Sequence, residues 1–527
     1  MKAVPISTRR RTSRRALGGA LAALCAGGLL LPACAPVRRH QSLPALQPGV
    51  EAAERSTDGT NATPTPTPIA TPTPAVAPEL RRYYEQELTW APCSGAPTFD
   101  CALVTVPLDY AQPEGGDIDL AAIRKPAGGT GKQRIGSLQI NPGGPGAQAL
   151  EYLVGKLDIF PPSIRASYDL VAMDPRGIGD STPVDCGPDP APAHDPADID
   201  ANAAAYDRVA AACERHAGEL LPHVGTPDVA RDMDVLRALL GDDRLNYYGM
   251  SYGTYLGATY AEMFPSRVGR MVLDGAMDPA LDAYRRWLDT ARGYQKAWEA
   301  FAADCVTRTD CPVGHSVQEA ARILDALRRT LNRAPLRHDE DTTVTGEDLS
   351  VSIKGTLRPH AWEDLRRMLR EVQGGDTTTV RQYSDDTPSG DQAFWVVSCL
   401  SSMLGARFTP AEAKAALARF VEVSPQFGES TVLGLLGCTH WPTPANQTSH
   451  PITAPGAAPI LVIGSTGDPA TPYNWSRSLA RRLSSGHLLT YDNTIHVAGF
   501  AGSACIDSAI DRYLISGRLP PAGKVCT

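Results

Sequence analysis

The sequence lacks the residue patterns on which several classes of protein depend. Its 12 cysteines include no C-x-x-C pair and its 11 histidines form no ligand-like cluster, so the usual spacing of a metal site is missing. The apolar stretch Ala16–Leu31 is too short and too rich in glycine to favour a membrane-spanning helix. These absences argue against a metalloprotein and against an integral membrane protein.

Acidic residues are absent from residues 1–33, where six basic residues precede the apolar stretch: Lys2, Arg9, Arg10, Arg11, Arg14 and Arg15. This order predicts a signal peptide over residues 1–33. Ser13-Arg-Arg-Ala-Leu17 also resembles a twin-arginine signal, so the Sec and twin-arginine export routes both stay open. Removing these residues changes the formal net charge from −8 to −14, and so acidic a protein is a poor candidate for binding nucleic acid.

The apolar stretch ends in Leu31-Pro-Ala-Cys34, which resembles a bacterial lipobox and predicts lipid attachment at Cys34. Cleavage next to an incidental cysteine is the alternative. Residues 34–78 turn to Pro and Thr, as in Thr63–Pro68 and Thr71–Pro74, and predict an extended, disordered linker. We therefore expect a monomer held by lipid on the outer face of the cell membrane or envelope, or a secreted protein if Cys34 carries no lipid.

A strand, a tight turn and a helix follow one another around residue 250. Leu245–Tyr248 predicts a buried strand and Thr254–Phe264 a helix. Between them lies Gly249-Met-Ser-Tyr-Gly253, a G-x-S-x-G nucleophile elbow, whose glycines avoid a clash between strand and helix backbones. A glycine-rich turn is the plain alternative. The buried strand predicted over Arg270–Asp274, one crossover later, favours Ser251 as a nucleophile.

A second glycine-rich loop follows another predicted strand. Ile135–Ile140 leads into Asn141-Pro-Gly-Gly-Pro-Gly146, where no side chain prevents the backbone N–H groups from facing a cavity. A turn without chemistry is the alternative. Because the strand is expected beside the elbow strand in a parallel sheet, we predict an oxyanion hole formed by the amides of Gly144 and Tyr252.

The C-terminal part of the chain offers an acid and a base. The predicted strand Ala458–Gly464 leads to Asp468, and the predicted strand Gly486–Tyr491 leads to His496, with a helix predicted over Tyr473–Leu483 between them. Each side chain thus follows the end of a strand, and parallel strands end at the same edge of a sheet.

The order Ser251, Asp468, His496 is the one that the α/β-hydrolase scaffold imposes on its catalytic triad. A lone histidine after a strand is usually a surface or capping residue, but this spacing favours His496 as the base. Asp492 is the competing carboxylate. It is disfavoured because it lies too near His496 along the chain to reach the imidazole from the far side.

The remaining pattern predicts an α/β fold of the α/β-hydrolase type, a mostly parallel eight-stranded sheet flanked by helices. Further strands are predicted over Phe99–Pro107, Ile118–Ile123 and Tyr168–Met173. A helix is predicted over Thr226–Leu240, with Thr226 as its N-cap. Asp174 and Arg176 are expected to brace loops rather than to do chemistry.

Alternation of strands and helices stops after residue 280 and resumes near residue 456. The intervening segment has helical periodicity over Ala297–Phe301, Val317–Leu331, Ala361–Val372 and Pro410–Val421. We predict a hydrolase core over residues 79–280 and 456–527, with residues 281–455 inserted as a helical lid at the active-site end.

Ten cysteines remain after Cys25 and Cys34 are set aside, an even number that favours disulfides in an exported protein. Spacing offers five short-range pairs, although the sequence does not prove the connectivity: Cys93 with Cys101, Cys186 with Cys213, Cys305 with Cys311, Cys399 with Cys438, and Cys505 with Cys526.

Four segments together resemble the tripeptidyl-aminopeptidase-like branch of the proline iminopeptidase family, found as exported or envelope proteins of actinobacteria. They are Asn141–Gly146, Asp174–Ser181, Gly249–Thr254 and Gly467–Pro472, within a resemblance that covers roughly residues 80–527. The resemblance implies a serine exopeptidase that removes short peptides from free N-termini, or a carboxylesterase of the cell envelope. Relatives carry an acidic residue shortly after the cysteine that matches Cys399, whereas this chain reads Cys399-Leu-Ser-Ser402.

The hypothesis drawn from these residues is acyl transfer to serine. His496 takes the proton of Ser251, Asp468 orients the imidazole, and the amides of Gly144 and Tyr252 stabilise the oxyanion, with no metal or organic cofactor. Cleavage of tripeptides is the first expectation and ester hydrolysis by the same triad the second. A lipid-tethered binding protein without catalysis is disfavoured, because it has no need for these groups together.

Overall fold

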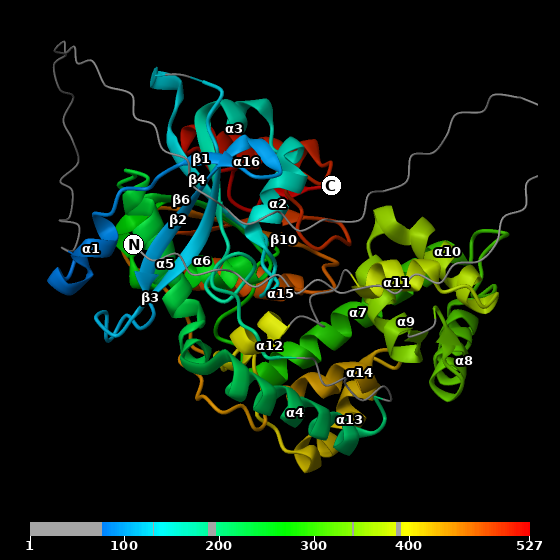
Figure 1. Ribbon diagram of the computed structural model, residues 1–527. Coiled ribbons are helices and arrows are strands. Elements are labelled where there is room, and N and C mark those ends of the chain that lie inside the picture. Colours follow the sequence, from blue (N-terminus) through cyan, green and yellow to red (C-terminus); the bar gives the residue numbers. More distant parts are fainter. Residues whose placement is uncertain (1–75, 130, 188–195, 340–341, 386–391) are drawn as a thin grey trace, which may run out of the picture. The chain divides into compact units, whose positions relative to one another are not determined.

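The computed structural model describes residues 76–129, 131–187, 196–339, 342–385 and 392–527. Ten strands form one sheet in this part of the chain (Figure 1). Their bounds are β1 Ala91–Cys93, β2 Ala96–Pro107, β3 Asp117–Lys125, β4 Gly136–Asn141, β5 Tyr168–Met173, β6 Leu245–Met250, β7 Val268–Asp274, β10 Ile460–Ser465, β11 Gly486–Tyr491 and β12 Val525–Cys526.

The strand order is β1-β2-β3-β5-β4-β6-β7-β10-β11-β12. β1, β2, β3 and β5 pair antiparallel in succession, and every pair from β5 onward is parallel. The expected count of eight strands was too low by β1 and β12, which are short and each end in a disulfide-bonded cysteine. The α/β-hydrolase fold is present.

Helices cover both faces of the sheet (Figure 1). One apolar cluster joins the sheet to α2 Ala149–Lys156, α3 Pro162–Ser167 and α16 Ala504–Ser516. A second joins its other face to α5 Thr226–Leu239, α6 Tyr252–Met263 and α15 Tyr473–Arg482. Side chains of a strand alternate between faces, and accordingly Tyr247 belongs to the second cluster and Tyr248 to the first.

The predicted N-cap of α5 is wrong. Thr226 is the first residue of the helix, Gly225 precedes it as the cap, and no side chain caps the helix. The Thr226 hydroxyl instead lies 2.9 Å from the hydroxyl of Tyr252, in the nucleophile elbow. The threonine thus anchors α5 to the elbow.

Helices dominate the described residues between β7 and β10. They are α7 Ala283–Cys305, α8 Val317–Arg333, α9 Gly346–Thr356, α10 Trp362–Gln373, α11 Thr378–Asp385, α12 Gln392–Cys399, α13 Pro410–Val423 and α14 Gly428–Val432, with a small hairpin of β8 Leu336–Arg337 and β9 Thr343–Val344. We call residues 281–455 the lid. A further helix from the first half of the chain, α4 Ile199–Ala217, packs against α13 through an apolar cluster shared by both (Figure 1).

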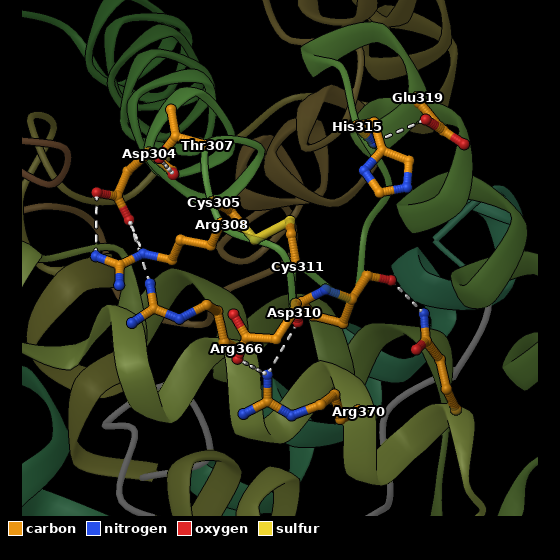
Figure 2. Close-up of a disulfide and its surroundings, with 12 residues drawn as sticks. Asp304, Cys305, Thr307, Arg308, Asp310, Cys311, His315, Glu319, Arg366 and Arg370 are labelled. Carbon is orange, nitrogen blue, oxygen red and sulfur yellow. Dashed lines mark hydrogen bonds and ion pairs between the residues drawn. A yellow bond between two sulfur atoms is a disulfide. The ribbon is translucent and has the colours of Figure 1, made fainter.

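The end of α7 is fixed by the disulfide Cys305–Cys311 and by ion pairs to α10 (Figure 2). Arg366 lies 3.2 Å from a carboxylate oxygen of Asp304, and Arg370 lies 3.4 Å from one of Asp310. These pairs are partly exposed, so each adds little stability alone. Together with the disulfide they attach the C-terminal end of α7 to α10.

The structure joins the ten cysteines of the described residues in the five short-range pairs named above. Cys34, the predicted signal peptide and almost all of the predicted linker lie outside the described residues. Among the helices that are described, none has the length and apolarity to cross a membrane.

Candidate active site

Ser251 occupies a strained turn between β6 and α6. Its φ of 53° is in a region that residues with side chains seldom adopt, as expected of a nucleophile elbow. A Cβ at Gly249 would lie 2.5 Å from the carbonyl oxygen of Gly253, and a Cβ at Gly253 would lie 2.7 Å from that of Asn141. The residues two positions before and after Ser251 must therefore both be glycine for the turn to form.

The glycine-rich loop after β4 lies directly against this turn. A Cβ at Gly143 would be 2.4 Å from the carbonyl oxygen of Met250 and 3.0 Å from the amide nitrogen of Tyr252. The Gly143 amide donates to the Asn141 side chain, 3.0 Å away. Within the described part of the chain, the amides of Gly144 and Tyr252 donate to no protein acceptor. Both predicted oxyanion donors are thus unengaged beside the elbow.

Asp468 and His496 are hydrogen-bonded to each other. His496 Nδ1 lies 3.0 and 3.1 Å from the two carboxylate oxygens of Asp468. The amides of Ala470 and Thr471 each donate to Asp468 Oδ1 at 2.9 Å, and the Thr471 hydroxyl donates to Oδ2 at 2.9 Å. These donors fix the orientation of the Asp468 carboxylate, which leaves Nε2 of His496 as the nitrogen for chemistry.

The electrostatics of His496 fit a base. Burial lowers the pKa of His496, but the carboxylates of Asp468 and Asp274 more than offset this, so its pKa is raised above the ordinary value. Its side chain is 26% exposed while that of Asp468 is 1% exposed. The acid is therefore sealed behind the imidazole, and the imidazole keeps an accessible surface.

Asp274, at the end of β7, connects the nucleophile turn to the histidine loop. Its carbonyl accepts from the Ser251 amide at 2.9 Å. Its fully buried carboxylate accepts from the amides of Ala498 and Gly499 at 3.0 and 2.7 Å and from the hydroxyl of Tyr248 at 2.9 Å. Sequence reasoning missed this role. The signal was an aspartate ending the strand that follows the elbow.

The remaining candidate residues fall outside the site. The competing carboxylate Asp492 accepts from the Thr466 hydroxyl at 2.7 Å rather than binding the imidazole. Arg176 forms a buried ion pair with Asp232 at 2.7 Å, and Asp174 accepts from the amides of Leu150 and Asp180. Asp174 and Arg176 thus brace loops, each with partners of its own.

Two members of the predicted triad are directly bonded, and the third is joined through the backbone. Across the described residues, the structure shows no hydrogen bond between the hydroxyl of Ser251 and His496. Asp274 nevertheless joins the two loops through the backbone, because it accepts from the amides of Ser251 and Ala498, and a Cβ at the adjacent Gly275 would lie 3.3 Å from the imidazole. Hydrogen bonds of a catalytic pair are often long without substrate and shorten when it binds.

The described residues contain no group of three or more histidine, cysteine, aspartate or glutamate side chains placed to hold a metal ion. What the site does offer is a serine at an elbow, an acid-oriented imidazole and two unengaged amides at one edge of a parallel sheet. This set of groups serves acyl transfer through a serine ester.

Comparison with known proteins places these features in a family. Residues 424–526 match the family model described as TAP-like protein. Serine protease Hip1 of Mycobacterium tuberculosis is 35% identical over 84% of this chain and 91% of that protein. Carboxylesterase B of the same species is 37% identical over 81% and 86%, and tripeptidyl aminopeptidase of Streptomyces lividans is 31% identical over 83% and 86%.

These similarities extend over the core and the lid alike. The family they indicate agrees with the geometry of the site, an elbow serine beside a hydrogen-bonded Asp468–His496 pair. The chain, a serine hydrolase, therefore belongs to the tripeptidyl-aminopeptidase-like family of α/β-hydrolases.

Proposed function

We propose that the protein is an exopeptidase that releases short peptides from free N-termini through an acyl-enzyme at Ser251. The observation that carries this is the pairing of His496 with a sealed Asp468 next to the elbow and its two unengaged amides. Similarity to the tripeptidyl aminopeptidase of Streptomyces lividans supports the choice of substrate.

In the first half-reaction, His496 Nε2 takes the proton of Ser251 as its oxygen attacks the scissile carbonyl. Asp468 stabilises the imidazolium, and the amides of Gly144 and Tyr252 bind the oxyanion. His496 then gives the proton to the leaving amine. Water hydrolyses the resulting ester with His496 as the base, which restores Ser251.

A peptidase of this kind needs a carboxylate to hold the substrate's ammonium group, and Glu347 of α9 supports this requirement. Its Oε1 lies 3.9 Å from Lys354 Nζ, and its Oε2 is buried without a hydrogen-bond partner in the described structure. Lys354 Nζ lies 5.9 Å from the ring of Tyr294, whose pKa is raised by burial and by the charge of Asp468. Glu347 thus lies in a row with Lys354 and Tyr294, and the last of these feels the charge of the catalytic acid.

Ester hydrolysis is the second candidate, favoured by the loop after Cys399. In this loop, Ser401 lies 3.0 Å from the hydroxyl of Tyr255 and accepts from the Met403 amide. This loop therefore contributes hydroxyl and backbone groups but no carboxylate. Carboxylesterase B, at 37% identity, supports the same reading.

A panel of short peptide amides and acyl esters, each with a free and a blocked amine, separates the two candidates. The proposal expects the free-amine peptides to be cleaved and the blocked ones to be poor substrates. It also expects Glu347→Gln to raise KM for free-amine peptides but not for esters. Hydrolysis of esters alone would select the esterase, and hydrolysis that survives in Ser251→Ala would remove both candidates.

Location belongs to the same proposal. Residues 1–33, which are basic and then apolar, are followed by Cys34, and this order supports export and lipid attachment on the outer face of the membrane. Expression of wild type and Cys34→Ala in an actinobacterial host tests it. Wild type should sediment with membranes and the variant should appear in the medium, whereas equal release of both would contradict the lipid anchor.

A further inference from the structure

The face of α7 that is turned toward the core carries Arg286, Asp289 and Gly293. Asp289 accepts from the indole nitrogen of Trp475 on α15 at 3.1 Å. A Cβ at Gly293 would lie 2.4 Å from the carbonyl oxygen of Pro469, the neighbour of the catalytic acid. Positions i, i+3 and i+7 of a helix share a face. Arg286 is therefore on the side of α7 that contacts the loop carrying the catalytic acid.

Arg286 is buried without a carboxylate. Its side chain is 7% exposed, and it donates from Nε to the Met403 carbonyl at 3.0 Å and from Nη2 to the Leu404 carbonyl at 2.7 Å. Nη1 bonds to none of the described residues, and it keeps some solvent-accessible surface. One end of the guanidinium fork therefore faces accessible space.

No carboxylate of the described residues compensates the charge of this guanidinium, although its central carbon lies 3.9 Å from the centre of the Trp287 ring. Burial lowers the pKa of Arg286 to about 9, and the only group that raises it is the phenol of Tyr294. A buried cation without a counter-ion is costly, and a bound anion would remove that cost.

The residues that accept from Arg286 pack beside the nucleophile turn. Met403 and Leu404, its two carbonyl partners, pack in one apolar cluster with Tyr252, the residue after the nucleophile. A second cation of the lid acts on the catalytic base: Arg358 is exposed, forms no ion pair in the described part of the chain, and its charge lowers the pKa of His496. Positive charge thus reaches the reacting groups from the lid.

We propose that Arg286 binds a carboxylate of the substrate through its free Nη1, so that the enzyme selects peptides or esters with an anionic group next to the scissile bond. The proposal rests on the hydrolase function proposed above and names its substrate class. A carboxylate fits because the guanidinium fork matches its geometry and its charge. The source of the carboxylate is either an acidic side chain or the C-terminus of a short peptide.

The alternative is a purely structural role, in which Arg286 only attaches α7 to the backbone of Met403 and Leu404; we call this role the clamp. The two roles differ in what they predict for neutral substrates. A clamp serves every substrate alike, whereas a binding residue matters only when the substrate carries the anion.

Short peptides in four versions test the proposal: a Glu or Gln residue next to the scissile bond, each with a free or amidated C-terminus. KM and kcat are measured on wild type, Arg286→Gln, Arg286→Lys and the control Arg285→Gln, which changes an exposed arginine one position earlier on α7. Arg286→Gln should raise KM about 10- to 100-fold for the carboxylate-bearing version that wild type prefers. Lysine should restore part of this, because it keeps the charge but loses the fork.

Preference for Glu over Gln would identify a side-chain carboxylate, and preference for the free over the amidated C-terminus would identify the terminal one. Equal losses on neutral and anionic peptides in Arg286→Gln would overturn the proposal in favour of the clamp. If that variant does not fold, the wild type alone decides, since an absence of any preference for a carboxylate refutes the subsite. Failure to cleave any peptide or ester would instead refute the proposed function.

Discussion

Among the buried arginines, one in the core and one in the lid have opposite surroundings. Arg176 in the core makes two 2.7 Å bonds to Asp232 and donates to three carbonyls, and its pKa is raised because the attraction of Asp232 outweighs the cost of burial. Arg286 in the lid has two carbonyls and no carboxylate, and burial lowers its pKa.

The two regions differ in whether a buried charge is paired with an opposite charge of the protein. Buried acids of the core have hydrogen-bond partners of their own before any ligand arrives, as Asp274 and Asp468 show. The lid leaves a guanidinium fork partly free where it meets the core. A rigid core that orients the catalytic groups can then be combined with a lid whose charge decides which substrates are bound.

The largest expected effect comes from removing the charge that the core supplies to the site. Asp468→Asn keeps the shape of the side chain but no longer stabilises the imidazolium or fixes its tautomer, so kcat should fall about 10⁴-fold. Steady-state kinetics on the preferred substrate, with a thermal melt to show a native fold, measures it. A loss below about tenfold would mean that another acid serves His496.

A stability measurement separates the two buried arginines. Arg176→Met leaves Asp232 buried without its partner and should cost about 3–5 kcal/mol in the free energy of unfolding. Arg286→Met removes an uncompensated cation and loses only two carbonyl bonds, so it should cost clearly less. Urea unfolding of both variants, with the disulfides intact, gives the comparison. Equal costs would show that the two sites are compensated alike.

A smaller effect is expected from the residue that joins the serine turn to the histidine loop. Asp274→Asn replaces an acceptor of three hydrogen bonds by an amide with one acceptor oxygen, which should loosen the loop after His496 and lower kcat about 10- to 100-fold. The matched control is Asp492→Asn, which changes an exposed carboxylate at the same sheet edge. If both variants behave alike, Asp274 has no positioning role.

Much of the core could be predicted from the sequence, because local patterns specify it. The strand Gly486–Tyr491 was predicted with its observed bounds, and β6 was predicted within two residues because apolar runs end at glycine-rich turns. The Asp468–His496 pair was predicted because each residue follows the end of a strand, and the structure shows the two hydrogen-bonded. Thr226 was misplaced because its partner, the hydroxyl of Tyr252, is distant in the sequence.

The lid was predictable only as helical. Periodicity identifies apolar faces but not which helix covers which, so neither the packing of α4 on α13 nor the contact of α7 with the loop that carries Asp468 followed from the sequence. Asp274 was missed for a related reason. Its partners, Ala498 and Gly499, meet it only after more than 220 residues of lid and core have folded between them.

The smallest expected effect is a displacement of the pH profile, and it tests whether the core's carboxylates act on the base. Because only neutral imidazole accepts the serine proton, kcat/KM should rise with pH through the raised pKa of His496, with its midpoint above the ordinary value of 6.5. The same shift stabilises the folded protein fully below pH 6.5, and this contribution is lost as the pH rises through the folded value. Asp274→Asn removes one of the two carboxylates that raise the pKa, so its midpoint should move to lower pH while Asp492→Asn keeps that of wild type. A midpoint that does not move in Asp274→Asn would mean that the charge of Asp274 is not felt at the imidazole, and that its role is confined to holding the loop.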